Sequence, residues 1–171
     1  QKMVRKARSK TQMRTLEKLT HIDANGKRLI NSDPPLLVPL RDFNLDRFFK
    51  KDGGFTAATT EGITKSWEHY LSSLPADRRF LLQRFELGDM ALRVGGVGSV
   101  GTHCTIVVLE GGAENDAIIL QQKEAGPSVL ANYLKPRHYQ QQAQRVVLGQ
   151  KLMQSVSDIF LGWHLGHLSH R

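Results

Sequence analysis

Three apolar runs within residues 90–123 constrain the fold more than any other feature of the sequence. They span Met90–Val94, Thr102–Leu109 and Ala117–Gln122, and glycine-containing segments separate them. Short runs of β-branched and aliphatic residues between turn-forming segments are typical of strands joined in sequence order. The sequence therefore predicts three consecutive antiparallel strands.

Helices are predicted both before and after these strands in the sequence. Residues 1–19 contain good helix formers and neither Gly nor Pro, one helix is expected to begin near Thr60, and another at Pro75. A long helix is predicted from about Tyr139 to Leu161. Its expected apolar stripe comprises Val146, Gly149, Leu152, Met153, Val156, Ile159 and Phe160. The predicted fold class is therefore α+β, with a small antiparallel sheet and packed helices.

A hairpin is predicted ahead of these elements. Residues 21–30 centre on Asn25-Gly26, the dipeptide preferred in type I′ turns, and apolar residues flank it. A short extended run follows at residues 36–40. We expect two regions. Residues 1–89 should be mainly helical with a hairpin, and residues 90–171 should form a lobe that contains a glycine-rich loop, a strand that ends in a lysine, and a long helix.

The composition excludes several classes of protein. The chain has 171 residues, of which 40% are hydrophobic and 23% charged, which suits one globular domain and excludes wholesale disorder. Its single cysteine, Cys104, excludes an internal disulfide and a Cys-rich zinc site, and we expect a small buried strand residue there. No run of 18 apolar residues and no apolar signal segment occur, so we expect a cytoplasmic protein with no membrane partner. Because the sequence begins Gln1-Lys2-Met3, we also expect a fragment of a longer chain.

The positive charge is concentrated at the N-terminus. The chain carries +8, and residues 1–18 contribute +6 through seven bases against Glu17 alone. Two interpretations stay open: the solvated face of a helix, or an arm in which residues 2–18 contact nucleic-acid phosphates. Residues 19–171 carry only +2, so the sequence does not indicate the basic face typical of a folded nucleic-acid-binding domain.

The glycine-rich segment at residues 96–101 matches the pattern G-x-G-x-x-G. In a dinucleotide-binding fold this pattern leads from a strand into a helix, and in a P-loop Gly-Lys-Ser or Gly-Lys-Thr follows it. Here it leads into the β-branched run that begins at Thr102, and no such lysine follows. Strand, glycine loop and strand is instead the arrangement that covers nucleotide phosphates in protein kinases, because glycines let the backbone approach them closely.

A kinase-like site also needs a lysine on the third strand. Lys123 ends that strand and is the only Lys or Arg between Arg93 and Lys135. The alternative is a β-hairpin with a glycine bulge and an ordinary lysine at a strand end. On the first interpretation, the predicted nucleotide-binding residues are Gly96, Gly98, Ser99, Gly101 and Lys123.

The order of several motifs resembles a mostly bacterial uncharacterised family, domain of unknown function 2252. The resemblance covers roughly residues 5–163. It rests on Val97–Thr102, Gln122–Ala125, Pro127–Leu130, Gln144–Val147, Gly149–Gln154 and Ser157–Trp163, with Asp33-Pro34-Pro35 and Asp77-Arg78-Arg79. The family is similar to the protein-kinase and aminoglycoside-phosphotransferase superfamily. The resemblance thus implies a protein-kinase-like N-lobe that binds ATP with Mg²⁺, with the glycines over the phosphates and Lys123 beneath them.

The sequence departs from the kinase pattern in two ways. Kinases pair the strand lysine with a glutamate on the next helix, whereas here Leu148 occupies the corresponding position and the predicted helix contains no acid before Asp158. Glu124 and Asp158 are the possible replacements. The resemblance also implies a catalytic loop and a metal-binding segment that lie outside this sequence. We therefore predict no catalytic residue and no metal ligand, and a chain that is inert alone.

The C-terminus carries His164, His167 and His170 at intervals of three. Helical spacing of this kind suits metal binding, but Gly162 and Gly166 disfavour a helix. We expect a frayed terminus and no metal site.

These observations favour the nucleotide-binding part of a kinase-like phosphotransferase with an unknown phosphate acceptor. The alternative is a non-catalytic binding or scaffold domain that contacts nucleic acid through residues 2–18.

Overall fold

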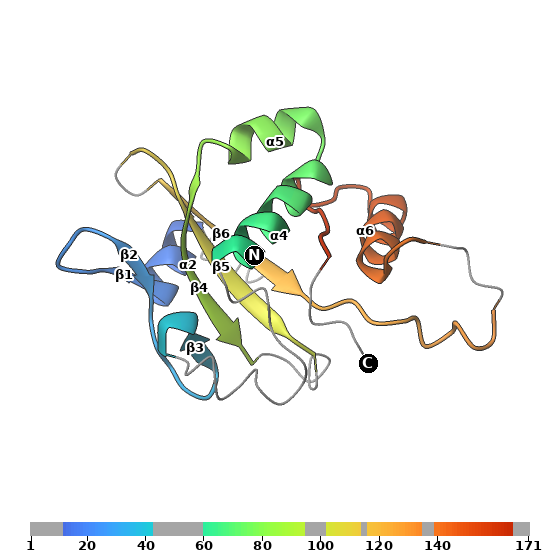
Figure 1. Ribbon diagram of the computed structural model, residues 1–171, viewed down its shortest axis with the longest axis horizontal. Helices are drawn as coiled ribbons and strands as arrows, with labels where there is room; N and C mark the ends of the chain where they lie inside the picture. Colours follow the sequence, from blue (N-terminus) through green and yellow to red (C-terminus); the bar gives the residue numbers. More distant parts are fainter. Residues whose placement is uncertain (1–11, 43–59, 95–101, 114–115, 135–138, 166–171) are drawn as a thin grey trace, which may run out of the picture. The chain divides into compact units, whose positions relative to one another are not determined.

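The computed structural model contains two compact units (Figure 1). Unit 1 comprises residues 1–44 and 84–123, and unit 2 comprises residues 45–83 and 124–171. These units are groups of contacting segments, so the predicted division at residue 89 stays a prediction. The structure describes residues 12–42, 60–94, 102–113, 116–134 and 139–165.

An antiparallel sheet of four strands forms the body of unit 1. Its order is β3-β4-β5-β6, and every neighbouring pair is antiparallel (Figure 1). The strands are β3 (Leu37–Pro39), β4 (Glu86–Arg93), β5 (Cys104–Glu110) and β6 (Ala117–Lys123). The three predicted consecutive strands are confirmed, and the extended run at residues 36–40 supplies the fourth. The α+β class with a small antiparallel sheet is thereby confirmed.

The predicted hairpin is confirmed as β1 (Thr20–Ile22) and β2 (Arg28–Ile30), but its turn is not of type I′. The Gly26 N–H donates to the Asp23 carbonyl at 3.0 Å, so the four-residue turn spans residues 23–26. A type I′ turn would place Asn25 and Gly26 at its two central positions, whereas Gly26 here is the last residue of the turn and takes the positive φ of 82°. The Asp23 carboxylate accepts the N–H groups of Asn25 and Lys27, which favours this longer turn.

Helix α2 (Gln12–Leu19) and the hairpin contribute to one hydrophobic core with the sheet. The buried cluster joins Ile30 of β2 to strand residues of β3, β4 and β5, and Leu19 and Ile119 pack against it. Alternate residues of β5, Ile106 and Val108, are both in this cluster because side chains two positions apart share one face of a sheet. A short 3₁₀ helix, η1 (Leu40–Asp42), follows β3.

Unit 2 contains three described helices, α4 (Thr60–Ser72), α5 (Ala76–Leu82) and α6 (Gln142–Met153). The predicted starts of α4 near Thr60 and of the next helix at Pro75, the N-cap of α5, are confirmed.

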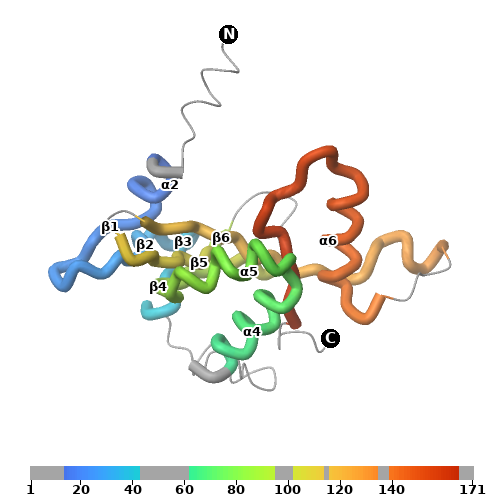
Figure 2. The backbone as a smooth tube through the Cα atoms, turned by 90° about the horizontal axis from the view of Figure 1, so that it is seen from above, coloured from blue at the N-terminus to red at the C-terminus, as the bar shows by residue number. Residues whose placement is uncertain are grey.

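The prediction of a helix to Leu161 is wrong, because α6 ends at Met153. Gln154 has an extended backbone with φ −99° and ψ 133°, and the chain then returns to α4 (Figure 2). The predicted apolar stripe is also wrong in its C-terminal half: Leu152, Met153 and Val156 are each at least 80% exposed, and Val147 is the buried residue of α6.

Candidate nucleotide-binding site

Lys123 is the last residue of β6, and it lies directly opposite Cys104, the first residue of β5. Every residue of β5 pairs with one of β6 without a register shift, so this position is fixed by the whole length of the ladder. The connection from β4 to β5 leaves β4 after Arg93 and enters β5 at Cys104. Lys123 therefore lies at the end of the sheet to which the predicted glycine loop is attached.

The four other predicted site residues, Gly96, Gly98, Ser99 and Gly101, lie outside the described residues. The structure describes the residues that flank them. Val94 donates its N–H to the Leu36 carbonyl at 2.9 Å, which continues the pairing of β3 with β4 to the start of the connection. The structure brings Lys123 to the strand that the loop enters, and the contacts of the loop itself stay a prediction.

The face of the sheet beside Lys123 changes from polar to apolar over a short distance. Gln121 shares this face, and its Nε2 donates to Cys104 Sγ at 3.1 Å. Cys104 is 4% exposed, which confirms the expected small buried residue. Beyond it the same face carries Ile106 and Val108 of the core. A ligand that contacts Lys123 on this face is thus restricted to the end of the sheet, because the core occupies the rest.

In kinases a glutamate pairs with the strand lysine. Among the described residues, no acidic side chain forms this pair with Lys123. Lys123 is exposed, and no ion pair holds it within this part of the chain. Helix α6 carries no acidic residue, as the sequence indicates. Asp158, one of the two predicted replacements, accepts the N–H of Phe160 through Oδ1 at 2.8 Å, so its carboxylate is engaged within unit 2.

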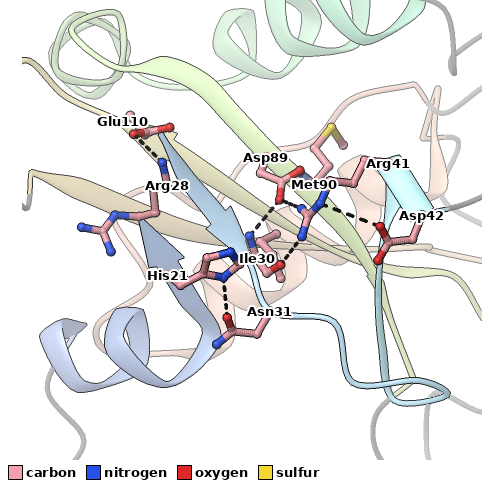
Figure 3. Close-up of polar contacts among 9 residues, drawn as sticks. All are labelled: His21, Arg28, Ile30, Asn31, Arg41, Asp42, Asp89, Met90 and Glu110. Atoms are coloured by element: carbon pink, nitrogen blue, oxygen red, sulfur yellow. Dashed lines mark hydrogen bonds and ion pairs between the residues drawn. The ribbon is translucent and has the colours of Figure 1, made fainter. Parts of the chain in front are cut away.

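A second polar cluster, which the sequence does not indicate, fastens the hairpin to the sheet (Figure 3). Asp89 Oδ2 accepts the Ile30 N–H at 2.8 Å and also pairs with Arg41 Nη1. Arg41 Nη2 donates to the Ile30 carbonyl at 2.6 Å, so the two charged side chains bracket one residue of β2. The register shift between Leu87 and Met90 breaks the regular alternation of β4 where Asp89 lies. The Asp89 side chain is only 11% exposed, and this arrangement satisfies its charge.

An open hollow of about 300 Å³ lies at the opposite end of the sheet from Lys123. Glu110 and Asp116 line it together with Arg28 of the hairpin. Arg28 donates its backbone N–H to Glu110 Oε2 at 3.4 Å, and its Nη1 donates to Thr20 Oγ1 at 3.0 Å. Thr20 Oγ1 in turn donates to the Leu16 carbonyl at 2.6 Å. These bonds link α2, the hairpin and β5, so the polar groups at the hollow stabilise the packing of these elements.

The basic N-terminal segment is described only in part. Within α2, Arg14, Glu17 and Lys18 are exposed around Leu16, which is 3% exposed. The solvated helix face is therefore confirmed for these residues. Residues 2–11 lie outside the described part, and their contact with nucleic acid stays a prediction.

The sequence matches one protein family along almost its entire length. The family is described as "Uncharacterized protein conserved in bacteria (DUF2252)", and the match covers residues 1–170. The chain belongs to this family. No curated protein and no solved structure matches the chain.

Among the described residues, no helix is long and apolar enough to cross a membrane. No group of three or more His, Cys, Asp or Glu side chains in the same residues is placed to hold a metal ion. The cytoplasmic location stays a prediction.

Proposed function

We propose that the chain is the nucleotide-binding portion of a kinase-like phosphotransferase, with ATP as its nucleotide. The observation that carries the proposal is the register of β5 and β6. It sets Lys123 opposite Cys104, the first residue of the strand that follows the connection containing G-x-G-x-x-G. Antiparallel strands that flank a glycine loop, with a lysine on the third strand, are the parts that kinases use to hold the phosphates.

Each predicted residue has a distinct role on this proposal. The backbone N–H groups of Gly96, Gly98 and Gly101 surround the phosphates, and the Ser99 hydroxyl donates to a phosphate oxygen. The Lys123 ammonium neutralises part of the phosphate charge. ATP supplies the transferable phosphoryl group, and Mg²⁺ is expected to arrive with it, since no metal cluster occurs in the described residues.

The same proposal limits what the 171 residues do alone. The sequence supplies no counterpart of the kinase catalytic base or of the metal-binding aspartate. We therefore expect nucleotide binding without turnover, and the phosphate acceptor remains outside the proposal.

Thermal unfolding with MgATP tests the proposal. At about 100 times the dissociation constant, a ligand of the folded state adds about 2.7 kcal/mol to the free energy of unfolding. For a chain of this length each kcal/mol corresponds to about 2–4 °C, so we expect Tm to rise by roughly 5–10 °C. Lys123→Ala is expected to weaken binding at least tenfold, because it removes a charge-assisted contact with phosphate.

Lys27→Ala is the matched control. Lys27 is also an exposed lysine of unit 1, and the hydrogen bonds recorded for it use its backbone. We expect this variant to bind MgATP like the unaltered chain. An unaltered chain without a Tm shift, or equal shifts in the unaltered chain and Lys123→Ala, contradicts the proposal.

A further inference from the structure

Two side chains of α4 and one that directly follows it, Ser73, hold the backbone of a C-terminal segment in unit 2. This strap segment, residues 158–165, has no helical or strand hydrogen-bond pattern. Tyr70 Oη donates to the Phe160 carbonyl at 2.7 Å, and Ser73 Oγ accepts the Trp163 N–H at 2.9 Å. His69 Nδ1 accepts the Leu165 N–H at 3.0 Å. One surface of α4 thus replaces the hydrogen bonds that secondary structure would otherwise supply.

The strap segment also fits tightly against α4. A Cβ atom on Gly162 would lie 2.6 Å from Ser73 Oγ and 2.9 Å from both Leu74 Cδ2 and Tyr70 Cε2. The backbone approaches α4 closely because glycine leaves this space empty. The prediction of a frayed terminus is therefore wrong for His164 and Leu165, and residues 166–171 lie outside the described part.

Two histidines meet at the end of this contact. His69 must be unprotonated at Nδ1 to accept the Leu165 N–H, because an imidazolium ring has donors only. His164 lies beside the same residue, with its Nδ1 3.0 Å from the Leu165 carbonyl. Burial lowers the pKa of His164 below its ordinary value of 6.5. The hydrogen bond to the Leu165 carbonyl acts in the opposite direction, the neighbouring His69 adds to the lowering, and the net shift is downward.

The other ionisable groups near His69 and His164 do not offset the cost of protonating these two rings in the bound segment. Tyr70 stays a neutral donor, because burial and the nearby Asp158 carboxylate raise its pKa. Asp158 accepts the Phe160 N–H and so fixes the start of the strap segment. Lys65 and Glu68, the charged residues of α4 closest in sequence to His69, are exposed.

We propose that the strap segment is an acid-released latch, in which protonation of His69 and His164 frees residues 163–165 from α4. In the bound segment His69 Nδ1 accepts the Leu165 N–H and so cannot carry a proton, and burial disfavours a charged His164; release of the segment removes both constraints. The bound state therefore holds fewer protons and loses stability as the pH falls. The loss begins near pH 6.5, the ordinary value of a free ring, and continues down to the lower pKa of His164 in the bound segment. Over this window the binding constant falls by up to about tenfold per pH unit for each proton taken up on release.

Amide hydrogen exchange measured by NMR on the full chain tests this latch. The observable is the protection of the Trp163 and Leu165 N–H groups relative to the intrinsic rate at each pH. In the unaltered chain we expect protection to fall at least tenfold between about pH 7 and about pH 5.5, while far-UV circular dichroism shows that the helices persist. Protection that is unchanged over this range overturns the proposal.

The double variant His69→Asn/His164→Asn keeps an acceptor oxygen and a donor amide but cannot titrate. We expect its protection to change less than about twofold over the same range. The control is His21→Asn, since His21 belongs to unit 1, where its Nδ1 lies 2.7 Å from Asn31 Oδ1, whereas α4 and the strap segment belong to unit 2. This control should behave like the unaltered chain, and a double variant that does so as well overturns the proposal.

The ring signals of the unaltered chain give a second measurement that needs no variant. The His164 Cε1–H resonance should titrate with a midpoint below 6.5, its ordinary value. A midpoint at or above that value overturns the latch. If acid unfolds the whole chain together with the segment, the double variant must unfold at a lower pH than the unaltered chain, and an unchanged transition overturns the proposal as well.

Discussion

The two units of the molecule are stabilised in different ways. In unit 1, a register-paired sheet buries a contiguous apolar cluster that includes Ile30, Ala91 and Ile106, all at most 1% exposed. In unit 2, Tyr70 of α4 and Ser73, the residue after α4, form hydrogen bonds with the backbone of an irregular segment. Unit 1 thus depends chiefly on apolar burial, whereas this part of unit 2 depends on hydrogen bonds and on one close backbone approach.

The contrast indicates where the chain tolerates change. Apolar cores accept substitutions that preserve volume and lose stability when volume is removed. A segment that is bound through its backbone should tolerate substitution of most of its own side chains. It should detach when a substitution adds an atom where its backbone lies against a neighbouring side chain. Substitutions of opposite kinds should therefore disrupt the two units.

Removing volume from unit 1 is expected to have the largest effect. Ile106→Ala should lower the free energy of unfolding by about 2–5 kcal/mol, because Ile106 is 1% exposed and its truncation leaves a cavity among rigid neighbours. Urea denaturation followed by circular dichroism measures the loss. Ile22→Ala is the control, since Ile22 is 51% exposed on β1, and it should cost at most about 1 kcal/mol. Equal losses in both variants would mean that the cluster around Ile106 does not dominate the stability of unit 1.

The strands of unit 1 were predictable from the sequence because their contacts are repetitive. Short apolar runs separated by glycine-containing segments predict β4, β5 and β6 from local patterns alone. The Asp89–Arg41 pair could not be predicted in this way, because it joins residues 48 positions apart and depends on an irregularity in β4. Nothing local to either residue distinguishes it from an exposed charge.

Apolar periodicity led to the wrong prediction in unit 2. The pattern in residues 146–160 suits a long helix, yet α6 ends at Met153 and the chain turns back to α4. The interactions that stabilise the alternative are tertiary: the Tyr70 hydroxyl donates to a backbone carbonyl and the Ser73 hydroxyl accepts a backbone N–H, each 90 positions away. Gly162 was the available signal, because a glycine in this position permits the close approach.

The candidate site was predictable only in part. The strand pattern correctly placed Lys123 at the end of β6, because its position follows from strand order. The contacts of Gly96, Gly98, Ser99 and Gly101 lie outside the described residues and stay predictions. Strand order determines at which end of the sheet a residue lies. The geometry of a loop and its contacts with a ligand depend instead on local backbone angles, which a residue pattern does not determine.

Adding one carbon to unit 2 is expected to have an intermediate effect. Gly162→Ala should cost about 1–3 kcal/mol, because the new Cβ would overlap Ser73, Leu74 and Tyr70 and force the strap segment away from α4. Gly149→Ala is the matched control, since nothing lies within 4 Å of its Cβ position in α6 and alanine favours the helix. It should stabilise the chain by about 0.5–1 kcal/mol. Hydrogen exchange by mass spectrometry should show faster exchange in α4 and the strap segment for Gly162→Ala only, and unchanged exchange there would refute the tight fit.

The smallest expected effect concerns Asp23, and it separates the acid responses of the two units. Hydrogen bonds from the backbone N–H groups of Lys27 and Asn25 lower the pKa of the Asp23 carboxyl below its ordinary value of 3.8. The charged carboxylate therefore stabilises the hairpin above pH 3.8, and this contribution is lost as the pH falls through the lower value of the folded chain. Asp23→Ala should lower the urea midpoint slightly at neutral pH, and the difference from the unaltered chain should shrink below pH 3.8. A gap for Asp23→Ala that already closes near pH 6.5, where the strap segment is expected to release, would mean that histidine protonation disrupts both units together.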